Sequence, residues 1–388
     1  MQFLTILIIG LLEGAEIDLF IPSFPELQSV FGLSPFLVQL TLAVNLAAQC
    51  VTSLIVGNLG DRYGRKPIIL LGLLIFMMGS LICIFAGFYW QLLLGRFIQG
   101  IGISGPAVLA YLVIADMYST EKQQQLMGVL NGSITLGMAF APVVGSYVSL
   151  YFKWQGNFTL LLILGLICTV LCLLFIPKGK PQPAITFSLR EYLPVLRSKK
   201  GIYYIVTLCL LLQGYWIFIG MAPILYMENL GVPLNEFGFY QGAMAGVFSI
   251  VSFATGFFLR RYGQRACFFF GVAMLIIFIF ATLIMMIIGV QGPLVITFVM
   301  QLLAIGTILT VNILWPLSLQ AVPDAKGRIA AIVVSSRLIL TAASLQAVSY
   351  FYQGTFVPIG IAICLTLILA LWSCYKLFQE DKIFGRVI

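Results

Sequence analysis

The chain has 388 residues, of which 61% are hydrophobic and only 9% are charged, and its formal net charge is +8. A soluble domain carries about 25% charged residues, so this composition excludes a soluble fold of this length. It also excludes a disordered chain, since disorder requires few hydrophobic residues and many charges. Eight cysteines are too few for a disulfide-framework protein of this size. The composition therefore indicates a polytopic membrane protein.

Twelve apolar runs are long enough to cross a bilayer as helices, which requires about 20 residues each. In chain order they lie at 3–23, 35–57, 67–87, 89–114, 124–150, 155–176, 202–227, 235–259, 267–288, 293–319, 328–350 and 355–375. Transmembrane β-strands would instead give short alternating segments. The fold class predicted is an all-α membrane protein with twelve transmembrane helices. The first run contains acidic residues and follows no basic segment, so we expect it to remain in the mature protein.

The positions of lysine and arginine predict the orientation of the chain. With the N-terminus inside, all of the 21 basic residues except Arg96, Lys153 and Arg337 fall in loops on the cytoplasmic side. We therefore expect a multi-pass protein of the bacterial inner membrane, with the lipid bilayer as its surroundings and both termini cytoplasmic. The positive charge is explained by this bias, and no nucleic-acid partner is expected.

The cysteines all lie within the predicted spans. Cys168 and Cys172 are one helical turn apart on one helix, which favours packing over a disulfide. The chain contains no histidine, and we expect neither a metal site nor any other cofactor.

A polar, proline-containing stretch at 177–201 divides the spans into six and six. It carries six basic residues and a single acidic one, Glu191. We predict an N-terminal six-helix bundle at 1–176, a cytoplasmic linker at 177–201 and a C-terminal six-helix bundle at 202–388. Within the linker, Leu189–Leu196 is a candidate amphipathic segment for the membrane surface.

The two halves contain an internal repeat. A shift of 199 residues superposes Gly57 on Gly256, Arg62 on Arg261 and Gly64 on Gly263, and each copy follows the second span of its half. Parallel repeats of six helices are typical of transporters, in which the substrate site lies near the midplane between the halves.

The first copy of the repeated loop resembles the signature loop of the major facilitator superfamily, G-x-L-x-D-R-x-G-R-R/K. The matching residues are Gly57, Leu59, Asp61, Arg62, Gly64, Arg65 and Lys66. The resemblance implies two pseudo-symmetric six-helix bundles and a cytoplasmic latch of Asp–Arg pairs, which Asp116 at the end of the fourth span completes. The alternative is an ordinary basic loop.

The fourth span contains Arg96, Gln99 and Gly100, a pattern similar to the family's R-x-x-Q-G motif, whose arginine is associated with proton transfer. An arginine within a span costs about 2.5–3.5 kcal/mol on insertion scales, so it indicates a function and a partner. The alternative is that Arg96 extends to the outer membrane surface.

The fifth span resembles the antiporter motif G-x-x-x-G-P-x-x-G-G. The residues at the fixed positions of the motif are Gly137, Ala141, Pro142, Gly145 and Ser146, with Ala141 and Ser146 in place of two glycines. Small residues let a neighbouring helix approach closely, and proline permits a bend. The resemblance implies the exporting drug–proton branch, although a plain kinked helix is an alternative.

The end of the first span resembles the D-x-Y-L-P-x-x-P segment of the Bcr/CflA group of drug transporters. The matching residues are Asp18, Pro22 and Pro25, with Phe20 in place of the tyrosine.

Three carboxylates in the first span are candidate proton carriers. Glu13 and Glu16 differ by about 60° around the helix axis and about 4.5 Å along it, so they share a face, whereas Asp18 is about 140° from Glu13 and has different neighbours. With Arg96 nearby, such groups can bind and release a proton during transport. The alternative is that they solvate a wet cavity.

Further polar and aromatic residues within the spans are candidates for lining a substrate cavity, or else for ordinary helix–helix hydrogen bonding. They are Asn45, Gln49, Tyr111, Asn131, Gln213, Trp216, Tyr240, Asn312, Trp315 and Arg337. Arg337 is near mid-depth and favours either a carboxylate partner or an anionic substrate.

Together these features predict a proton-coupled exporter of small amphipathic drugs that works by alternating access. We expect its partners to be a small-molecule substrate and the coupling proton, and we expect it to act as a monomer. The alternative is a carrier of one metabolite, such as a carboxylate siderophore, a sugar or another natural product. An enzyme is not expected, because no nucleophile–histidine pair or histidine metal site can be formed.

Overall fold

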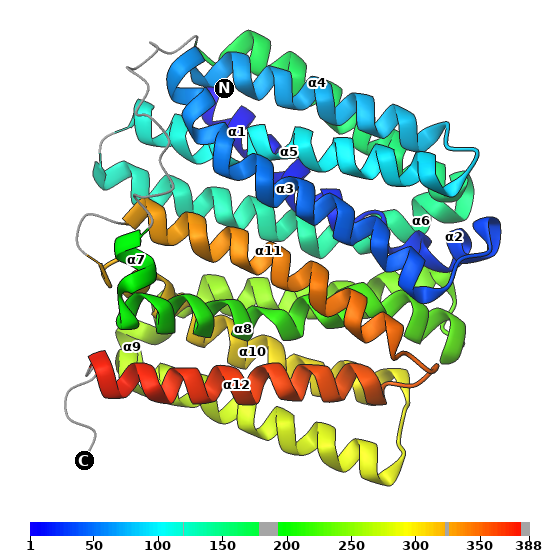
Figure 1. Ribbon diagram of the computed structural model, residues 1–388, viewed down its shortest axis with the longest axis vertical. Coiled ribbons are helices and arrows are strands. Elements are labelled where there is room, and N and C mark those ends of the chain that lie inside the picture. Colours follow the sequence, from blue (N-terminus) through cyan, green and yellow to red (C-terminus); the bar gives the residue numbers. More distant parts are fainter. Residues whose placement is uncertain (119, 178–192, 323–325, 382–388) are drawn as a thin grey trace. The chain divides into compact units, whose positions relative to one another are not determined.

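The computed structural model describes residues 1–118, 120–177, 193–322 and 326–381, and within these ranges it consists of long helices without a β-strand (Figure 1). This confirms the all-α fold class. The chain divides into two compact units, the first containing Met1–Phe187 with Gly231–Gly242 and the second containing Ser188–Leu230 with Ala243–Ile388.

The first unit begins with a broken helix that carries the three acidic residues. Its elements are α1 (Gln2–Asp18), the 3-10 turn η1 (Ile21–Ser23), α2 (Phe24–Phe31), α3 (Pro35–Tyr63), α4 (Arg65–Ile84), α5 (Tyr89–Met117) and α6 (Thr120–Phe175). Pro22 and Pro25 follow the end of α1, and because proline lacks a backbone N–H, the regular helix is interrupted there.

The remaining elements follow the linker region. They are α7 (Leu193–Arg197), α8 (Lys199–Pro223), the π-helical turn η3 (Ile224–Asn229), α9 (Leu234–Ile288), α10 (Pro293–Ser318), α11 (Lys326–Tyr350) and α12 (Val357–Asp381). The first turns of α9 belong to the first unit and the rest of the helix to the second.

Two of the longest helices contain a backbone break where the sequence predicts a loop between spans. In α6 the break is at Lys153, with φ 58° and ψ −174°, and in α9 it is at Gly263, with φ 80°. Within the described residues, nine helical segments have the length and composition to cross a membrane. Two of these nine segments, in α6 and α9, contain two predicted spans each, so the nine segments correspond to eleven spans. The twelfth predicted span corresponds to α1, which at 17 residues is slightly shorter than the other segments.

The predicted domain boundaries differ from the observed units at two places. Helix α8 begins at Lys199, inside the expected linker, and Gly231–Gly242 belongs to the first unit although we expected it in the second bundle. The latter difference arises because the glycines of this segment permit close backbone contact with α6, as described below. Residues 178–192 of the linker, including most of the candidate amphipathic segment, lie outside the described residues.

The internal repeat is visible in the backbone. Gly64, between α3 and α4, has φ 93° and ψ 153°, and its counterpart Gly263 has φ 80° and ψ 159°. Positive φ at both positions explains the repeated glycine, since other residues rarely adopt this conformation. The same turn therefore joins the second and third spans of each half.

Side-chain burial in the bundles suits a membrane rather than water. Large apolar side chains such as Phe85, Ile287 and Leu294 are exposed, whereas Glu16, Asp18 and Arg96 are buried. Exposed apolar surface of this extent requires contact with lipid, and a buried charge requires a partner.

Candidate functional site: a buried ion pair and its neighbours

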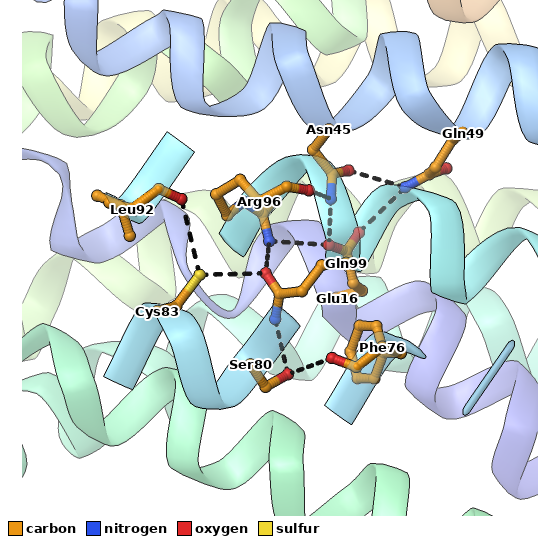
Figure 2. A network of polar contacts seen from close by, with 9 residues as sticks. All are labelled: Glu16, Asn45, Gln49, Phe76, Ser80, Cys83, Leu92, Arg96 and Gln99. Carbon is orange, nitrogen blue, oxygen red and sulfur yellow. Dashed lines mark hydrogen bonds and ion pairs between the residues drawn. The ribbon is translucent and has the colours of Figure 1, made fainter. Parts of the chain in front are cut away.

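The centre of the first unit holds an ion pair between α1 and α5. Arg96 Nη1 donates to Glu16 Oε1 over 2.8 Å, and the exposed fractions of the two side chains are 0% and 1% (Figure 2). The suggestion that Arg96 extends to the membrane surface is therefore wrong. Arg96 has a partner, as expected for a cation within a span, and that partner is Glu16; the mid-span Glu13 is half-buried.

Two amides from α3 complete the surroundings of the Glu16 carboxylate. Asn45 Nδ2 donates to Glu16 Oε1 over 2.9 Å, and Gln49 Nε2 donates to Oε2 over 3.2 Å. Asn45 also donates to the Arg96 carbonyl and accepts from Gln49 (Figure 2). The carboxylate thus has partners on both oxygens, which compensates part of the cost of burying its charge.

On the other side of Arg96 the network continues into α4. Arg96 Nη1 donates to Gln99 Oε1 over 2.8 Å, and Gln99 Nε2 donates to Ser80 Oγ over 2.8 Å. Ser80 in turn donates to the Phe76 carbonyl. Gln99 and Gly100 therefore have separate tasks in the R-x-x-Q-G pattern, since a Cβ at Gly100 would lie 2.3 Å from the Asn45 carbonyl oxygen. Gly100 allows α3 to pack closely against α5, and Gln99 accepts a hydrogen bond from Arg96.

The rest of the Arg96 guanidinium faces aromatic rings. Within the described residues, Arg96 Nε and Nη2 have no hydrogen-bond partner. The guanidinium carbon lies 5.1 Å from the ring centre of Phe20 and 5.9 Å from that of Phe158. Aromatic faces attract a cation more strongly where water is excluded. This gives Phe20, the residue that replaces the tyrosine of the Bcr/CflA segment, a physical role that requires no hydroxyl group.

Asp18 lies in different surroundings from Glu16, as the helical geometry predicts. Its Oδ1 accepts a hydrogen bond from Nε2 of Gln241 over 3.4 Å, and both side chains are buried. Gln241 lies in the first turns of α9, within the first unit. The first span therefore carries two polar sites, one at Glu16 and one at Asp18.

The residues that resemble the antiporter motif pack α6 against α1. A Cβ at Gly137 would lie 2.7 Å from the Leu11 carbonyl oxygen, and one at Gly145 would lie 2.1 Å from the Leu19 carbonyl oxygen. Ala141 is buried, and Ser146 Oγ donates to the carbonyl of Pro142 in the same helix. The small residues thus bring α6 onto the helix that carries the acidic residues.

The same stretch of α6 also contacts the start of α9. A Cβ at Gly238 would lie 2.8 Å from the Pro142 carbonyl oxygen, and one at Gly242 would lie 3.1 Å from the Ala139 carbonyl oxygen. The two glycines are one turn apart, so they form a small-residue face for close helix contact.

The signature loop forms the expected cluster of charges at the other end of the unit. Arg65, at the start of α4, pairs with Asp61 near the end of α3, and its Nε donates to Asp116 Oδ2 over 2.9 Å. Lys66 donates to the Leu173 carbonyl over 2.7 Å, and Arg62 packs over the ring of Tyr63. Within the described residues, no atom lies within 4 Å of a Cβ built on Gly57. The cluster joins α3, α4, α5 and α6.

The residues predicted to line a substrate cavity differ in their contacts and burial. Asn45 and Gln49 belong to the Glu16 network. Tyr111 donates to Asn131 over 2.6 Å, and Asn312 donates to Thr255 over 3.1 Å, so these join helices. Of the others, Gln213 is buried, and Tyr240 and Trp315 are half-buried.

Arg337 in the second unit stacks on an aromatic ring. Its guanidinium carbon lies 5.5 Å from the ring centre of Trp216. On the same helix, Gln346 has no hydrogen-bond partner for either amide atom within the described residues.

Residues that the sequence did not assign to the Glu16 or Asp18 sites take part in both. Ser80 and Phe158 complete the surroundings of Gln99 and Arg96, and Gln241 contacts Asp18. A serine or a phenylalanine within a span is too common to attract notice in one sequence. Gln241 is one of many polar residues within the predicted spans, and its distance along the chain concealed its partner.

Comparisons with known proteins identify the family and the fold of the chain. A family model described as Major Facilitator Superfamily matches residues 6–345. Multidrug resistance protein MdtL of Salmonella paratyphi B is 29% identical over 258 residues, which cover 66% of this chain and 65% of that protein. The match therefore spans just under two thirds of the length of this relative.

Solved structures resemble the chain over nearly its full length. The crystal structure of a D-xylose–proton symporter has a TM-score of 0.79 at 15% identity and covers 100% of this chain and 99% of that chain. The crystal structure of the peptide transporter POT in complex with sulfate also has a TM-score of 0.79, at 14% identity, and covers 98% and 95%. These structures show the fold. Together with the family model, they establish that this chain is a multi-pass membrane protein that belongs to the major facilitator superfamily.

Proposed function

We propose that the protein is a proton-coupled secondary active transporter that exports small amphipathic drugs by alternating access. The observation that carries the proposal is the buried Glu16–Arg96 pair, because burying two charged groups within a span is costly and ionisable residues are retained there chiefly for function. The antiporter-like packing of α6 on α1 and the similarity to a multidrug resistance protein support export rather than import. Neither the family nor the described residues favour an enzyme.

The contacts of the ion pair suggest how it responds to a proton. When Glu16 is ionised, it neutralises Arg96 and accepts from the two α3 amides. When Glu16 is protonated, Arg96 loses its counter-ion, and the contacts that remain are Gln99 and the rings of Phe20 and Phe158. Binding one proton thus leaves one uncompensated charge in a region of low dielectric constant. Rearrangement or hydration of the bundle relieves that charge, which couples proton binding to conformation.

The membrane potential can drive such a cycle. A potential of 100 mV contributes about 2.3 kcal/mol for each elementary charge moved across the membrane. We propose the proton as the only coupling ion, with no other cofactor, and a monomer as the working unit. The bias of basic residues supports an inner-membrane location with both termini in the cytoplasm.

The Asp61–Arg65–Asp116 cluster is the proposed conformational latch. Its two carboxylates are partly exposed, and exposed ion pairs contribute only about 0–1 kcal/mol each. Weak pairs of this kind suit a contact that is made and broken in each cycle. The Bcr/CflA-like end of the first span supports a drug exporter over other members of the superfamily.

A second candidate function is transport of one anionic metabolite. The observation that favours it is the guanidinium of Arg337, which lies over the ring of Trp216 within the second unit. An arginine within a span suits an anionic ligand such as a planar carboxylate, which a guanidinium can bind through two parallel hydrogen bonds.

Transport into proteoliposomes tests the proposal. Purified protein is reconstituted, a pH gradient is imposed, and uptake is measured for a panel of cationic, neutral and polycarboxylate compounds. We expect gradient-driven uptake of amphipathic drugs, its loss in Glu16→Gln, and its retention in the matched control Glu26→Gln, which lies on the next helical segment outside the spans. Polycarboxylate uptake that is lost in Arg337→Gln would instead support the second function. Uptake that does not depend on pH or voltage would contradict the proposed proton coupling.

A further inference from the structure

Asp18 and Gln241 share one hydrogen bond and leave one oxygen each without a partner. Gln241 Nε2 donates to Asp18 Oδ1 over 3.4 Å. Among the described residues, Asp18 Oδ2 and Gln241 Oε1 have no partner, and each side chain is 1% exposed. An ionised carboxylate and an amide carbonyl are both acceptors only. The two unsatisfied atoms are therefore of the same kind, and neither can satisfy the other.

One proton would satisfy both oxygens. A protonated carboxyl group has one O–H donor, which can be directed at the amide oxygen of Gln241 while the amide N–H continues to donate to the other carboxyl oxygen. The product is a cyclic pair of two hydrogen bonds between an acid and an amide. Because a buried acceptor without a partner is costly, this arrangement favours the protonated acid.

The helices around this pair are held together by backbone contact rather than by large side chains. Gly238 lies against the Pro142 carbonyl of α6, and Gly145 of α6 lies against the Leu19 carbonyl, next to Asp18. The first turns of α9 therefore rest on the seam between α1 and α6. A side-chain hydrogen bond between Gln241 and Asp18 joins α9 to α1 at this point.

We propose that Asp18 and Gln241 form a proton-dependent clasp that holds the first turns of α9 on the α1–α6 seam. The proton is shared between the carboxyl of Asp18 and the amide oxygen of Gln241, and its departure to water leaves two facing acceptors and opens the seam. This inference deepens the proposed function, on which it rests. It assigns Gln241 as a positioning residue for a second proton site, distinct from the Glu16–Arg96 pair.

Other ionisable groups on the elements that pack here have to be considered. They include Glu13 and Glu16 on α1, Arg96 on α5, Tyr147 on α6, and Glu236 and Tyr240 on α9. Glu16 is close to Asp18 in the chain, but its charge is already neutralised by Arg96. Tyr147 packs edge-on against Phe239, on the exposed side of the same seam. None of these groups supplies the donor that the two oxygens lack.

The rings of Tyr147 and Phe239 provide a reporter for the seam. Their centres are 6.4 Å apart and both side chains are exposed, whereas the native cysteines are buried. The Tyr147→Cys/Phe239→Cys protein is reconstituted in liposomes without a gradient or a drug, and a short methanethiosulfonate cross-linker is applied at about pH 5.5 and about pH 8.5. We expect the cross-linked fraction to fall about threefold or more between the two values as the population shifts.

Two variants in the same background decide whether the proton acts at this pair. Asp18→Asn supplies a permanent N–H donor to Gln241, so its cross-linking should stay high at both pH values. Gln241→Leu removes both hydrogen bonds, so its cross-linking should stay low at both. Hydrogen exchange of residues 234–242 in protein without introduced cysteines gives a second measurement, with slower exchange expected at low pH in the parent but not in Asp18→Asn.

Cross-linking and exchange that do not depend on pH in the parent would overturn the clasp, as would an unchanged pH dependence in Asp18→Asn. Neither experiment requires transport. A pH-dependent seam in a protein that shows no gradient-driven export would contradict the proposed function and leave the clasp standing, whereas export with a pH-independent seam would contradict the clasp alone.

Discussion

Removing one partner of the Glu16–Arg96 pair is expected to destabilise the first unit strongly. Both side chains are almost completely inaccessible to solvent, and Glu16 accepts from Arg96, Asn45 and Gln49. Glu16→Ala leaves a buried guanidinium without a counter-ion, which costs about 3–5 kcal/mol. Glu16→Gln removes the charge but retains one acceptor oxygen for Arg96 and Asn45, so we expect a smaller loss, about 1–3 kcal/mol.

A double-mutant cycle isolates the pair itself. Arg96→Met alone leaves the Glu16 carboxylate uncompensated and should cost about 3–5 kcal/mol, but Glu16→Gln/Arg96→Met contains no buried charge. The double variant should therefore be more stable than the sum of the single losses predicts, by about 2 kcal/mol or more. Free energies of unfolding measured by denaturant titration in mixed micelles give the four values. Additive losses within about 0.5 kcal/mol would refute the reasoning, because they would show that the two charges do not compensate each other.

Further predictions concern the backbone and the surface. Gly145→Val should destabilise the protein by about 1–3 kcal/mol or more, because its Cβ would lie 2.1 Å from the carbonyl oxygen of Leu19, the residue that follows α1. Gly57→Ala, with open space around it, should unfold at an unchanged or higher denaturant concentration. Lys153 adopts φ 58° and ψ −174°, a region that suits glycine, so Lys153→Gly should be more stable than Lys153→Ala by about 1–3 kcal/mol; equal stability would contradict the strain. Burial raises the pKa of the Glu26 carboxyl, which also accepts from the backbone of Trp154, so its contribution to stability is lost as the pH rises through that pKa. Glu26→Gln should flatten this part of the stability–pH curve, and an unaltered curve would show that Glu26 is not the group responsible.

The fold could be predicted from the sequence because a bilayer imposes a simple requirement on each segment. Apolar runs mark the helices, and the predicted loops fall at Lys153 and Gly263, where the backbone of α6 and of α9 breaks. The exception is the start of α9, whose contacts place Gly231–Gly242 in the first unit. Packing between residues far apart in sequence decides such a boundary, and a single sequence does not contain it.

The site could be predicted only in part. A motif singled out Arg96, whereas Glu16 was one of three candidate carboxylates in the first span. Glu13 lies on the same helical face, and only the rotation and depth of α1 against α5 determine which carboxylate meets the arginine. The proximity of Gln241 to Asp18 depends on the tertiary fold, since the two residues are separated by 223 positions. Long-range pairing of this kind leaves no local pattern.

Proton movement during transport tests the central claim most directly. Proteoliposomes that contain a pH-sensitive dye are given a transported drug at an imposed voltage, and the internal pH is followed for the parent protein and for Glu16→Gln. The account predicts a drug-dependent pH change in the parent and none in Glu16→Gln, although the variant still binds the drug. A drug-dependent pH change of equal rate in both proteins would contradict it.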